Sequence, residues 1–243
     1  MKYVLILGAT SDIAKSLAEI YASKGINLYL AARNLSKLEN FIVDLSSKFS
    51  VKIIQLYFDA LEYDSHQKFY ENLKFKPVGV ISAIGLLGNQ NFSEENFDSA
   101  KNIIDTNFIG IVSIINIIVS DFEKRKEGFI ICISSVAGDR GRSSNYFYGS
   151  AKSALNSYLS GIRNRLHFSK VSVLTVKPGF VNTSMTKNLN LPKIITSSPK
   201  KVARDIYHAQ KKGRNIIYTS WYWKWIMLII NSIPEFIFKK LKL

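Results

Sequence analysis

A tyrosine and a lysine four residues apart, Tyr148 and Lys152, are the side chains best suited to acid–base chemistry in this 243-residue chain. Residues i and i+4 share one face of a helix, so we expect both side chains to point to the same place. A lysine ammonium beside a phenol favours the phenolate and should lower its pKa from about 10. The tyrosine then becomes a usable acid or base near neutral pH. Because this spacing is common by chance, other residues must support the interpretation.

Ser135 provides the first support, since it follows an apolar run of strand length and precedes Tyr148 by thirteen residues. A hydroxyl at the end of a strand can donate a hydrogen bond to a carbonyl oxygen that gains negative charge. The three side chains together therefore indicate proton transfer to or from the oxygen of a carbonyl group.

The first predicted strand is followed by the turn Gly8-Ala9-Thr10-Ser11-Asp12-Ile13-Ala14. Such a turn places free backbone N–H groups and the positive end of a helix beside a pyrophosphate. Gly8 permits close backbone approach, and the small Ala14 lets the helix pack near the strand. With a single glycine, an ordinary turn capped by Ser11 or Asp12 is the alternative.

The end of the second predicted strand, Ala31-Ala32-Arg33, bears on the choice of cofactor. An acidic residue at this point hydrogen-bonds a ribose 2′-hydroxyl, whereas an arginine can pair with a 2′-phosphate. Ala32 and Arg33 therefore favour NADP(H), and a merely solvated Arg33 is the alternative.

Apolar runs of strand length alternate with amphipathic segments of helix length, which is typical of a parallel α/β sheet. We predict one doubly wound (Rossmann) α/β domain over residues 1–220, with a seven-stranded parallel sheet, and a C-terminal amphipathic extension over residues 221–243. The predicted strands are 3–7, 27–32, 51–58, 78–84, 129–134, 171–176 and 215–219. The predicted helices begin after the first turn and then cover 35–49, 62–73, 98–126 and 148–167.

Composition narrows the possible partners and the compartment. The net charge of +15 favours anionic partners such as phosphorylated substrates or an anionic membrane surface, and on its own supports no nucleic-acid function. The single Cys132 gives no reason to expect an oxidising compartment. The three histidines are far apart, so we expect no metal site. The short apolar run before Gly8 does not suit a secretory signal, and we expect a cytoplasmic enzyme.

Taken together, these residues make the chain resemble the short-chain dehydrogenase/reductase family over nearly all of its length. Asp59 is similar to the family's aspartate that meets adenine, Asn107 to the helix asparagine of the catalytic tetrad, and the Pro178-Gly179 segment to the one that meets the nicotinamide. The resemblance implies contacts with NADP(H) from Gly8, Thr10, Ser11, Asp12, Ile13, Arg33, Asp59, Ala60, Ala83, Gly85, Tyr148, Lys152, Pro178, Gly179, Val181 and Thr183.

The resemblance also implies the catalytic roles. Tyr148 gives a proton to the substrate carbonyl during reduction, and Lys152 lowers the tyrosine pKa and holds the nicotinamide ribose. Ser135 orients the carbonyl. Asn107 supports a water that leads protons to Lys152, or else is a helix-packing amide.

The chain departs from the family pattern in two places. Leu7 replaces the usual threonine of the first turn, and Asp12 and Ala14 stand where its second and third glycines are expected. An aspartate near a pyrophosphate repels it unless the side chain points away. After the fourth strand, Ser82-Ala83-Ile84-Gly85 keeps a small-residue bend but loses an asparagine.

The tail from Trp221 contains all three tryptophans and lysines near both of its ends. Its apolar run reaches only to Ile233 before Pro234, which is too short for a bilayer span of about 20 residues. Clustered aromatics with flanking lysines suit an amphipathic segment on the inner face of a membrane. Packing over the domain and a subunit contact are the alternatives.

The tail and the first turn together resemble one branch of the family, which includes the reductase component of decaprenylphosphoryl-β-D-ribose 2′-epimerase. That resemblance implies reduction of a lipid-linked keto-sugar, a step in cell-envelope polysaccharide biosynthesis, with a partner oxidase. A fatty or sterol-like ketone is the alternative substrate, and a non-catalytic cofactor-binding protein is the alternative function. Homo-oligomerisation through the helices at 98–126 and 148–167 is implied as well. Arg140, Arg142, Arg163 and Arg165 could bind a phosphate, although we expect a solvated surface.

Overall fold

The computed structural model describes residues 1–241 as alternating strands and helices. The strands are β1 Tyr3–Leu7, β2 Asn27–Ala32, β3 Ile53–Tyr57, β4 Gly79–Ser82, β5 Phe129–Ile133, β6 Ser172–Pro178 and β7 Ile216–Thr219. The helices are α1 Asp12–Ser23, α2 Ser36–Lys48, α3 His66–Glu71, α4 Gln90–Glu95, α5 Phe97–Ile104, α6 Gly110–Arg125, α7 Tyr146–Arg165, α8 Pro199–Lys211, α9 Trp223–Ser232 and α10 Glu235–Phe238.

All seven strands form one parallel sheet in the order β3-β2-β1-β4-β5-β6-β7. The predicted Rossmann domain and its seven-stranded parallel sheet are therefore confirmed. From the central β1 the chain builds outward to β3 on one side and, after crossing back to β4, to β7 on the other. Ligands of such sheets bind beyond the carboxyl ends of the strands, where the order reverses. The functional side chains are therefore expected beyond β1, β4 and β5.

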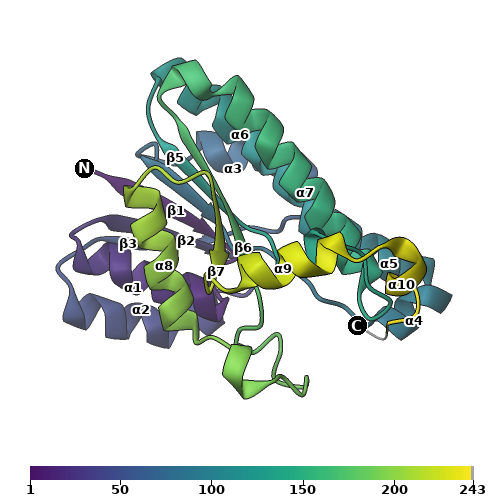
Figure 1. The fold of residues 1–243 in the computed structure, drawn as a ribbon. Coiled ribbons are helices and arrows are strands. Elements are labelled where there is room, and N and C mark those ends of the chain that lie inside the picture. The colour runs from purple at the N-terminus through teal and green to yellow at the C-terminus, as the bar shows by residue number, and fades with distance from the viewer. Residues whose placement is uncertain (242–243) are drawn as a thin grey trace.

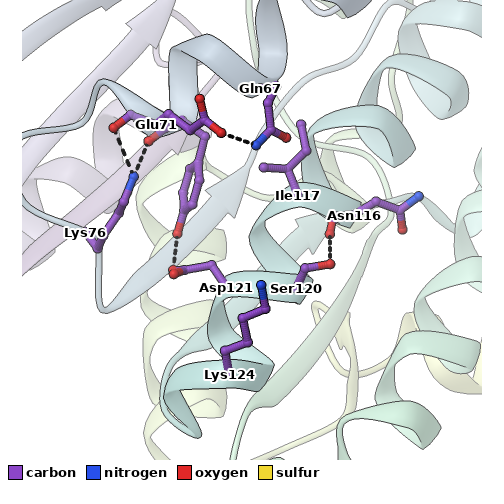
Figure 2. Close-up of a pocket in the computed structure, with 9 residues that line it drawn as sticks. Gln67, Glu71, Lys76, Asn116, Ile117, Ser120, Asp121 and Lys124 are labelled. Atoms are coloured by element: carbon purple, nitrogen blue, oxygen red, sulfur yellow. Dashed lines mark hydrogen bonds between the residues drawn. The ribbon is translucent and has the colours of Figure 1, made fainter.

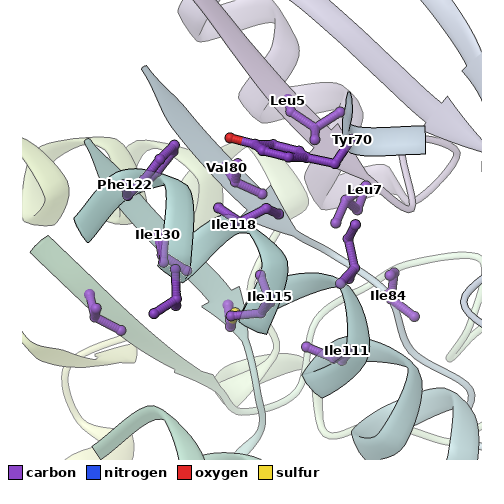
Figure 3. Packing of buried hydrophobic residues seen from close by; sticks show 14 of the residues in the cluster. Leu5, Leu7, Tyr70, Val80, Ile84, Ile111, Ile115, Ile118, Phe122 and Ile130 are labelled. Carbon is purple, nitrogen blue, oxygen red and sulfur yellow. The ribbon is translucent and has the colours of Figure 1, made fainter. Parts of the chain in front are cut away.

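Helices cover both faces of the sheet (Figure 1). On one face, apolar side chains of α1, α2 and α8 bury Val4, Ile6 and Leu30 of the strands. On the other face, α3, α6 and α7 pack over Leu5 and Val80. Figure 3 shows this second core, in which successive isoleucines of α6 point into the sheet beside Tyr70 and Phe122. Two buried faces explain why the strands are apolar along their whole length.

The long helix predicted over 98–126 is interrupted in the structure. It consists of α5, a π-helical segment Asp105–Ile109 and α6. By length and composition, the run Phe97–Arg125 could cross a membrane, but half of its most apolar window is buried inside the protein. Its hydrophobicity is therefore used in covering the sheet.

The structure adds helices that were not predicted, chiefly α8 and the short α4. The sequence around α8 does carry helix signals: Ser198 accepts a hydrogen bond from the Lys201 N–H, Pro199 is the first residue, and Val202 and Ile206 lie on the buried face. The many lysines and arginines of this segment hide that pattern. The predicted helix over 62–73 is shorter, since α3 follows a single 3-10 turn.

The predicted C-terminal extension forms α9 and α10, and α9 packs on the domain. Trp223 and Met227 are buried beside Val136, Phe180 and neighbouring aromatics. From the end of β7, α9 runs towards α10, α4 and α5 (Figure 1).

Candidate active site

One large cavity, with a volume of about 1060 Å³, opens at the carboxyl ends of the strands. Every residue predicted to contact the cofactor lines it, and so does Ser135. Asn107 does not line this cavity, because it is fully buried behind Thr106. The residues predicted from the sequence come from the carboxyl ends of the six strands β1 to β6 and from helices α1 and α7, and they meet in this one cavity.

Two glycines bring the serine-bearing loop against the helix that carries the tyrosine. A Cβ atom on Gly138, in the turn after β5, would lie 2.7 Å from the backbone carbon of Lys152. One on Gly149 would lie 2.9 Å from the carbonyl oxygen of Ala137. Neither position has room for a side chain, so the loop and α7 touch backbone to backbone. This contact is what places Ser135 beside Tyr148.

Burial controls the protonation of Tyr148. It raises the pKa of the phenol to about 12, and the neighbouring Ser135 hydroxyl opposes this only in part. The expectation that Lys152 lowers this pKa is therefore wrong: the pKa is raised, although the ammonium lies 5.6 Å from the centre of the tyrosine ring. With this pKa, Tyr148 is fully protonated at neutral pH and is ready to donate a proton.

Lys152 lies on the next turn of α7 and is almost completely buried. Its ammonium donates hydrogen bonds to the carbonyl oxygens of Ile133, at 3.2 Å, and Ile84, at 3.4 Å. Burial lowers its pKa to about 8, and the thiol of Cys132 opposes this shift. The lysine is thus fixed between the ends of β4 and β5 with a proton that it can release near physiological pH.

The π-helical segment gives Asn107 its position. The wider turn lets the Asn107 amide donate to the Ile103 carbonyl at 2.8 Å, and it also donates to the Leu86 carbonyl at 2.7 Å. Its oxygen accepts from the Leu86 N–H at 3.2 Å. A Cβ on Gly85 would lie 3.4 Å from that oxygen and 3.7 Å from the Lys152 amine, so Gly85 separates the two groups. These contacts fit the packing role; the water-holding role remains a prediction.

At the other end of the cavity, the first turn has the features that a dinucleotide requires. Gly8 has a φ of +74°, and a Cβ there would lie 2.9 Å from the Ala83 backbone. Ser11, the N-cap of α1, makes no side-chain hydrogen bond to the helix, which leaves the first-turn amides available to an anion. Arg33 and Lys37 line the far end of the cavity, where they could pair with a phosphate.

Comparison with known proteins agrees with this geometry. A family model described as short chain dehydrogenase matches residues 2–193. The chain belongs to the short-chain dehydrogenase/reductase family. It is accordingly an oxidoreductase.

Two relatives of this dehydrogenase/reductase illustrate the range of similarity. An uncharacterized oxidoreductase of Mycobacterium tuberculosis is 30% identical over 241 residues, which cover 98% of this chain and 96% of the relative. An NADP-dependent 3-hydroxy acid dehydrogenase of Schizosaccharomyces pombe is 32% identical over 190 residues, which cover 76% of this chain and 73% of the relative.

Solved structures share the fold at lower identity. A short-chain dehydrogenase from Sphingobium yanoikuyae in complex with NADPH superposes with a TM-score of 0.84 at 18% identity, covering 97% of both chains. An actinorhodin polyketide ketoreductase with NADPH gives a TM-score of 0.76 at 18% identity, covering 85% of this chain and 89% of the other.

The aspartate in the first turn of this dehydrogenase/reductase has a partner across the cavity. The Asp12 carboxylate accepts a hydrogen bond of 2.7 Å from the Ser184 N–H, in the loop that follows β6. The charge is thus directed at a backbone donor. Asp12 therefore joins the two walls of the cavity, a contact that the sequence could not show.

The tail packs against residues that line the catalytic end of the cavity. A Cβ on Gly179 would lie within 1.9 Å of the Trp223 indole, so this glycine is needed where α9 packs on the Pro-Gly segment. Arg140 holds the end of α9 by donating to the carbonyl oxygens of Ile230 and Ile233, at 2.5 and 2.7 Å. Its guanidinium also lies over the Phe238 ring, 3.6 Å from the centroid.

Four arginines, at positions 140, 142, 163 and 165, were expected on the solvated surface. This prediction is wrong for three of them. Arg140 binds the tail, and Arg163 donates to the Val173 and Asn215 carbonyls and to the Thr175 hydroxyl. Arg142 lines the catalytic end of the cavity, where it was not predicted. Only Arg165 is exposed, paired with Glu123.

A second hollow, of about 430 Å³, lies between α3 and α6 (Figure 2). Its polar groups bond one another: the Tyr70 hydroxyl donates to Asp121 at 2.6 Å, and Lys76 donates to the Tyr70 carbonyl. Among the described residues, no three histidine, cysteine or acidic side chains gather as metal ligands, here or elsewhere.

Proposed function

We propose that this protein is an NADPH-dependent carbonyl reductase. The observation that carries the proposal is a protonated, partly buried Tyr148 that shares one cavity with Ser135 and Lys152, while basic side chains line the nucleotide end. Arg33 and Lys37 would hold the 2′-phosphate, and the α1 amides the pyrophosphate. Similarity to a dehydrogenase that is NADP-dependent, and to folds that hold NADPH, supports this cofactor.

The residues of the site act on the substrate oxygen. A nicotinamide cofactor bound beside Gly179 supplies the hydride to the carbonyl carbon. Ser135 donates a hydrogen bond to the carbonyl oxygen as negative charge develops on it. Tyr148 transfers its proton to that oxygen, and Lys152, whose pKa is about 8, can return a proton to the phenol. Asn107 fixes the Leu86 backbone beside these groups.

The proposed substrate is a keto group on a lipid-linked sugar, reduced as one half of an epimerisation with a partner oxidase. The resemblance of the first turn and the tail to the epimerase branch supports it. The apolar tail beside the catalytic end of the cavity also agrees with a substrate that carries a lipid. A fatty or sterol-like ketone would use the same tail and is the second candidate.

Membrane contact through the tail is part of this proposal, with the enzyme at the cytoplasmic face. α9 buries Trp223 and Met227 in the domain, yet Trp225, Leu228 and Ile229 on its other side are more than half exposed. An exposed apolar helix face flanked by lysines suits the interface of a bilayer.

We also propose that the enzyme is a homo-oligomer through α6 and α7. The outer side of α7 exposes short side chains, Ser153, Ser157 and Ser160, which would let the same helix of a second copy approach closely. The π-helical segment before α6 contributes the exposed Ile109, and α6 contributes the partly exposed Ile117.

The test is consumption of NADPH by the purified protein with a farnesylphosphoryl 2-keto-pentose, beside Tyr148→Phe. We expect turnover that falls at least 1000-fold in the variant, because the phenylalanine lacks the hydroxyl that gives its proton to the carbonyl oxygen, while NADPH binding is retained. Turnover only of fatty or sterol-like ketones would replace the substrate. No turnover with any carbonyl would contradict the reductase, and faster turnover with NADH would contradict the cofactor.

A further inference from the structure

An arginine that the proposed reaction does not use is enclosed at the catalytic end of the cavity. Arg142 lies in the loop between β5 and α7 and lines the cavity together with Tyr148. One terminal nitrogen of its guanidinium donates to the Val136 carbonyl at a long 3.3 Å and lies 3.7 Å from the Met227 sulfur. Its Nε atom is buried and has no hydrogen-bond partner among the described residues. Arg142 therefore has an N–H donor, at Nε, that makes no hydrogen bond with the described residues.

Asp139, whose charge acts on Arg142, forms no ion pair with it. Both oxygens of Asp139 are engaged elsewhere, one by the Lys177 ammonium at 2.5 Å and the other by the Tyr218 hydroxyl at 2.8 Å. No carboxylate within residues 1–241 forms an ion pair with Arg142. A partly buried charge without a counterion is costly, so an anion that enters the cavity would be bound favourably.

A second polar atom nearby also lacks a partner. Asn145 is the N-cap of α7, but its side chain makes no capping hydrogen bond, although an asparagine in this place normally does. Its Oδ1 atom is buried without a donor, and the residue lines the same cavity three positions before Tyr148. This acceptor suits a hydroxyl on the substrate.

We propose that Arg142 and Asn145 form a substrate subsite, in which Arg142 binds an oxyanion of the substrate and Asn145 accepts a hydrogen bond from one of its hydroxyls. This inference rests on the proposed reductase and names its substrate class: a ketone that carries a phosphate or carboxylate. The planar guanidinium can offer Nε and a terminal nitrogen to two oxygens of one anion. A hydroxyl beside the anion favours a phosphorylated keto-sugar over a keto acid. A neutral fatty or sterol-like ketone would leave both atoms unpaired.

The experiment compares matched pairs of ketones that differ only in the anion. The first pair is the farnesylphosphoryl 2-keto-pentose and the farnesyl glycoside of the same keto-pentose. The second is a 3-oxo acid and its methyl ester. The measured quantity is the ratio of kcat/KM for the charged ketone to kcat/KM for the neutral one. In Arg142→Gln we expect this ratio to fall 10- to 100-fold for the pair that matches the natural anion.

Two variants complete the series. Asn145→Asp keeps a good N-cap but places a carboxylate beside Arg142, so it should lower the ratio even if Arg142→Gln folds poorly. Arg204→Gln removes one positive charge from an exposed position on α8 and should leave the ratio as it is in the wild type. A fall in the sugar pair supports the phosphate, and a fall only in the acid pair supports a carboxylate.

A ratio that changes in neither pair would overturn the subsite while leaving the reductase intact. If no keto-sugar is reduced, calorimetric titration of the NADP⁺-loaded protein with farnesyl phosphate and farnesol separates the two proposals. A preference for farnesyl phosphate that Arg142→Gln abolishes would support the subsite without the proposed reaction. Equal binding of both probes would overturn it.

Discussion

Burial gives Tyr148 and Lys152 protonation states that the spacing of the two residues does not predict. It raises the pKa of the phenol to about 12 and lowers that of the amine to about 8. The sequence could predict that both side chains share a face of a helix. It could not predict how deeply they are enclosed, because this depends on the close contact between α7 and the loop at Gly138. Likewise, the sequence could not predict that Arg142 has no ion-pair partner, because this depends on the bonds that Asp139 makes with Lys177 and Tyr218.

The buried lysine should make the protein less stable than its packing allows. Below pH 8 the Lys152 amine is charged in both the folded and the unfolded state, and the folded protein bears the cost of burying it. A pKa of about 8 in place of 10.5 corresponds to ~3 kcal/mol. We expect Lys152→Met to raise the free energy of unfolding of the cofactor-free protein by about 1–3 kcal/mol at pH 7, and to abolish reduction.

The pH dependence distinguishes this explanation from better packing of the methionine. Between pH 8 and pH 10.5 the amine is neutral in the folded protein and still charged in the unfolded protein. The free energy of unfolding of the wild type therefore rises over this range, whereas that of the variant does not. The advantage of Lys152→Met should therefore shrink across this range and disappear above it, as measured by urea unfolding. The exposed Lys24→Met should show no such trend. An advantage that is the same at pH 7 and pH 10.5 would contradict a charge effect.

Among the elements, the strands were the most predictable, since each is an apolar run that both faces of the sheet bury. β1 and β2 have the predicted bounds, and the others differ by a few residues at their ends. The π-helical segment was not predictable, because Asn107 is one of several polar residues in this run and two of its hydrogen bonds go to Leu86, which lies 21 residues earlier in the chain. α8 was missed because its charged residues obscure a regular apolar face.

The contact between the turn after β5 and α7 should be sensitive to one methyl group. In Gly138→Ala the added Cβ would lie 2.7 Å from the Lys152 backbone, so the turn must move away from the helix and take Ser135 with it. We expect a loss of about 1–3 kcal/mol in stability and a fall of at least tenfold in kcat. Steady-state kinetics and thermal unfolding measure both.

A matched control lies in the same loop. A Cβ on Gly141 would meet nothing within 4 Å, so Gly141→Ala should leave kcat and stability close to those of the wild type. If Gly138→Ala also leaves kcat unchanged, the backbone contact does not position Ser135.

In the whole molecule, the tail has two different sides: one side of α9 packs on the catalytic domain, and the other side is exposed to solvent. Trp223 packs on Gly179 and Met227 touches Arg142, so one side of α9 supports two residues that line the cavity. The opposite side is apolar and exposed. Removing the tail would therefore alter the cavity as well as any membrane contact, and loss of activity in a truncated protein would not identify the cause.

Substitutions on the outer side of α9 separate the two roles. Trp225 and Ile229 lie one helical turn apart, are 54% and 67% exposed, and do not line the cavity. We expect the double variant Trp225→Glu with Ile229→Glu to bind anionic liposomes at least tenfold more weakly in a sedimentation assay, because two side chains that would enter the bilayer become charged. NADPH binding should be unchanged.

Truncation before Trp221 should weaken both liposome binding and the kcat/KM for a soluble ketone. If the double variant sediments with liposomes as the wild type does, the outer side of α9 is not the membrane contact, and the function of the tail is to support Gly179 and Arg142 in the wall of the cavity.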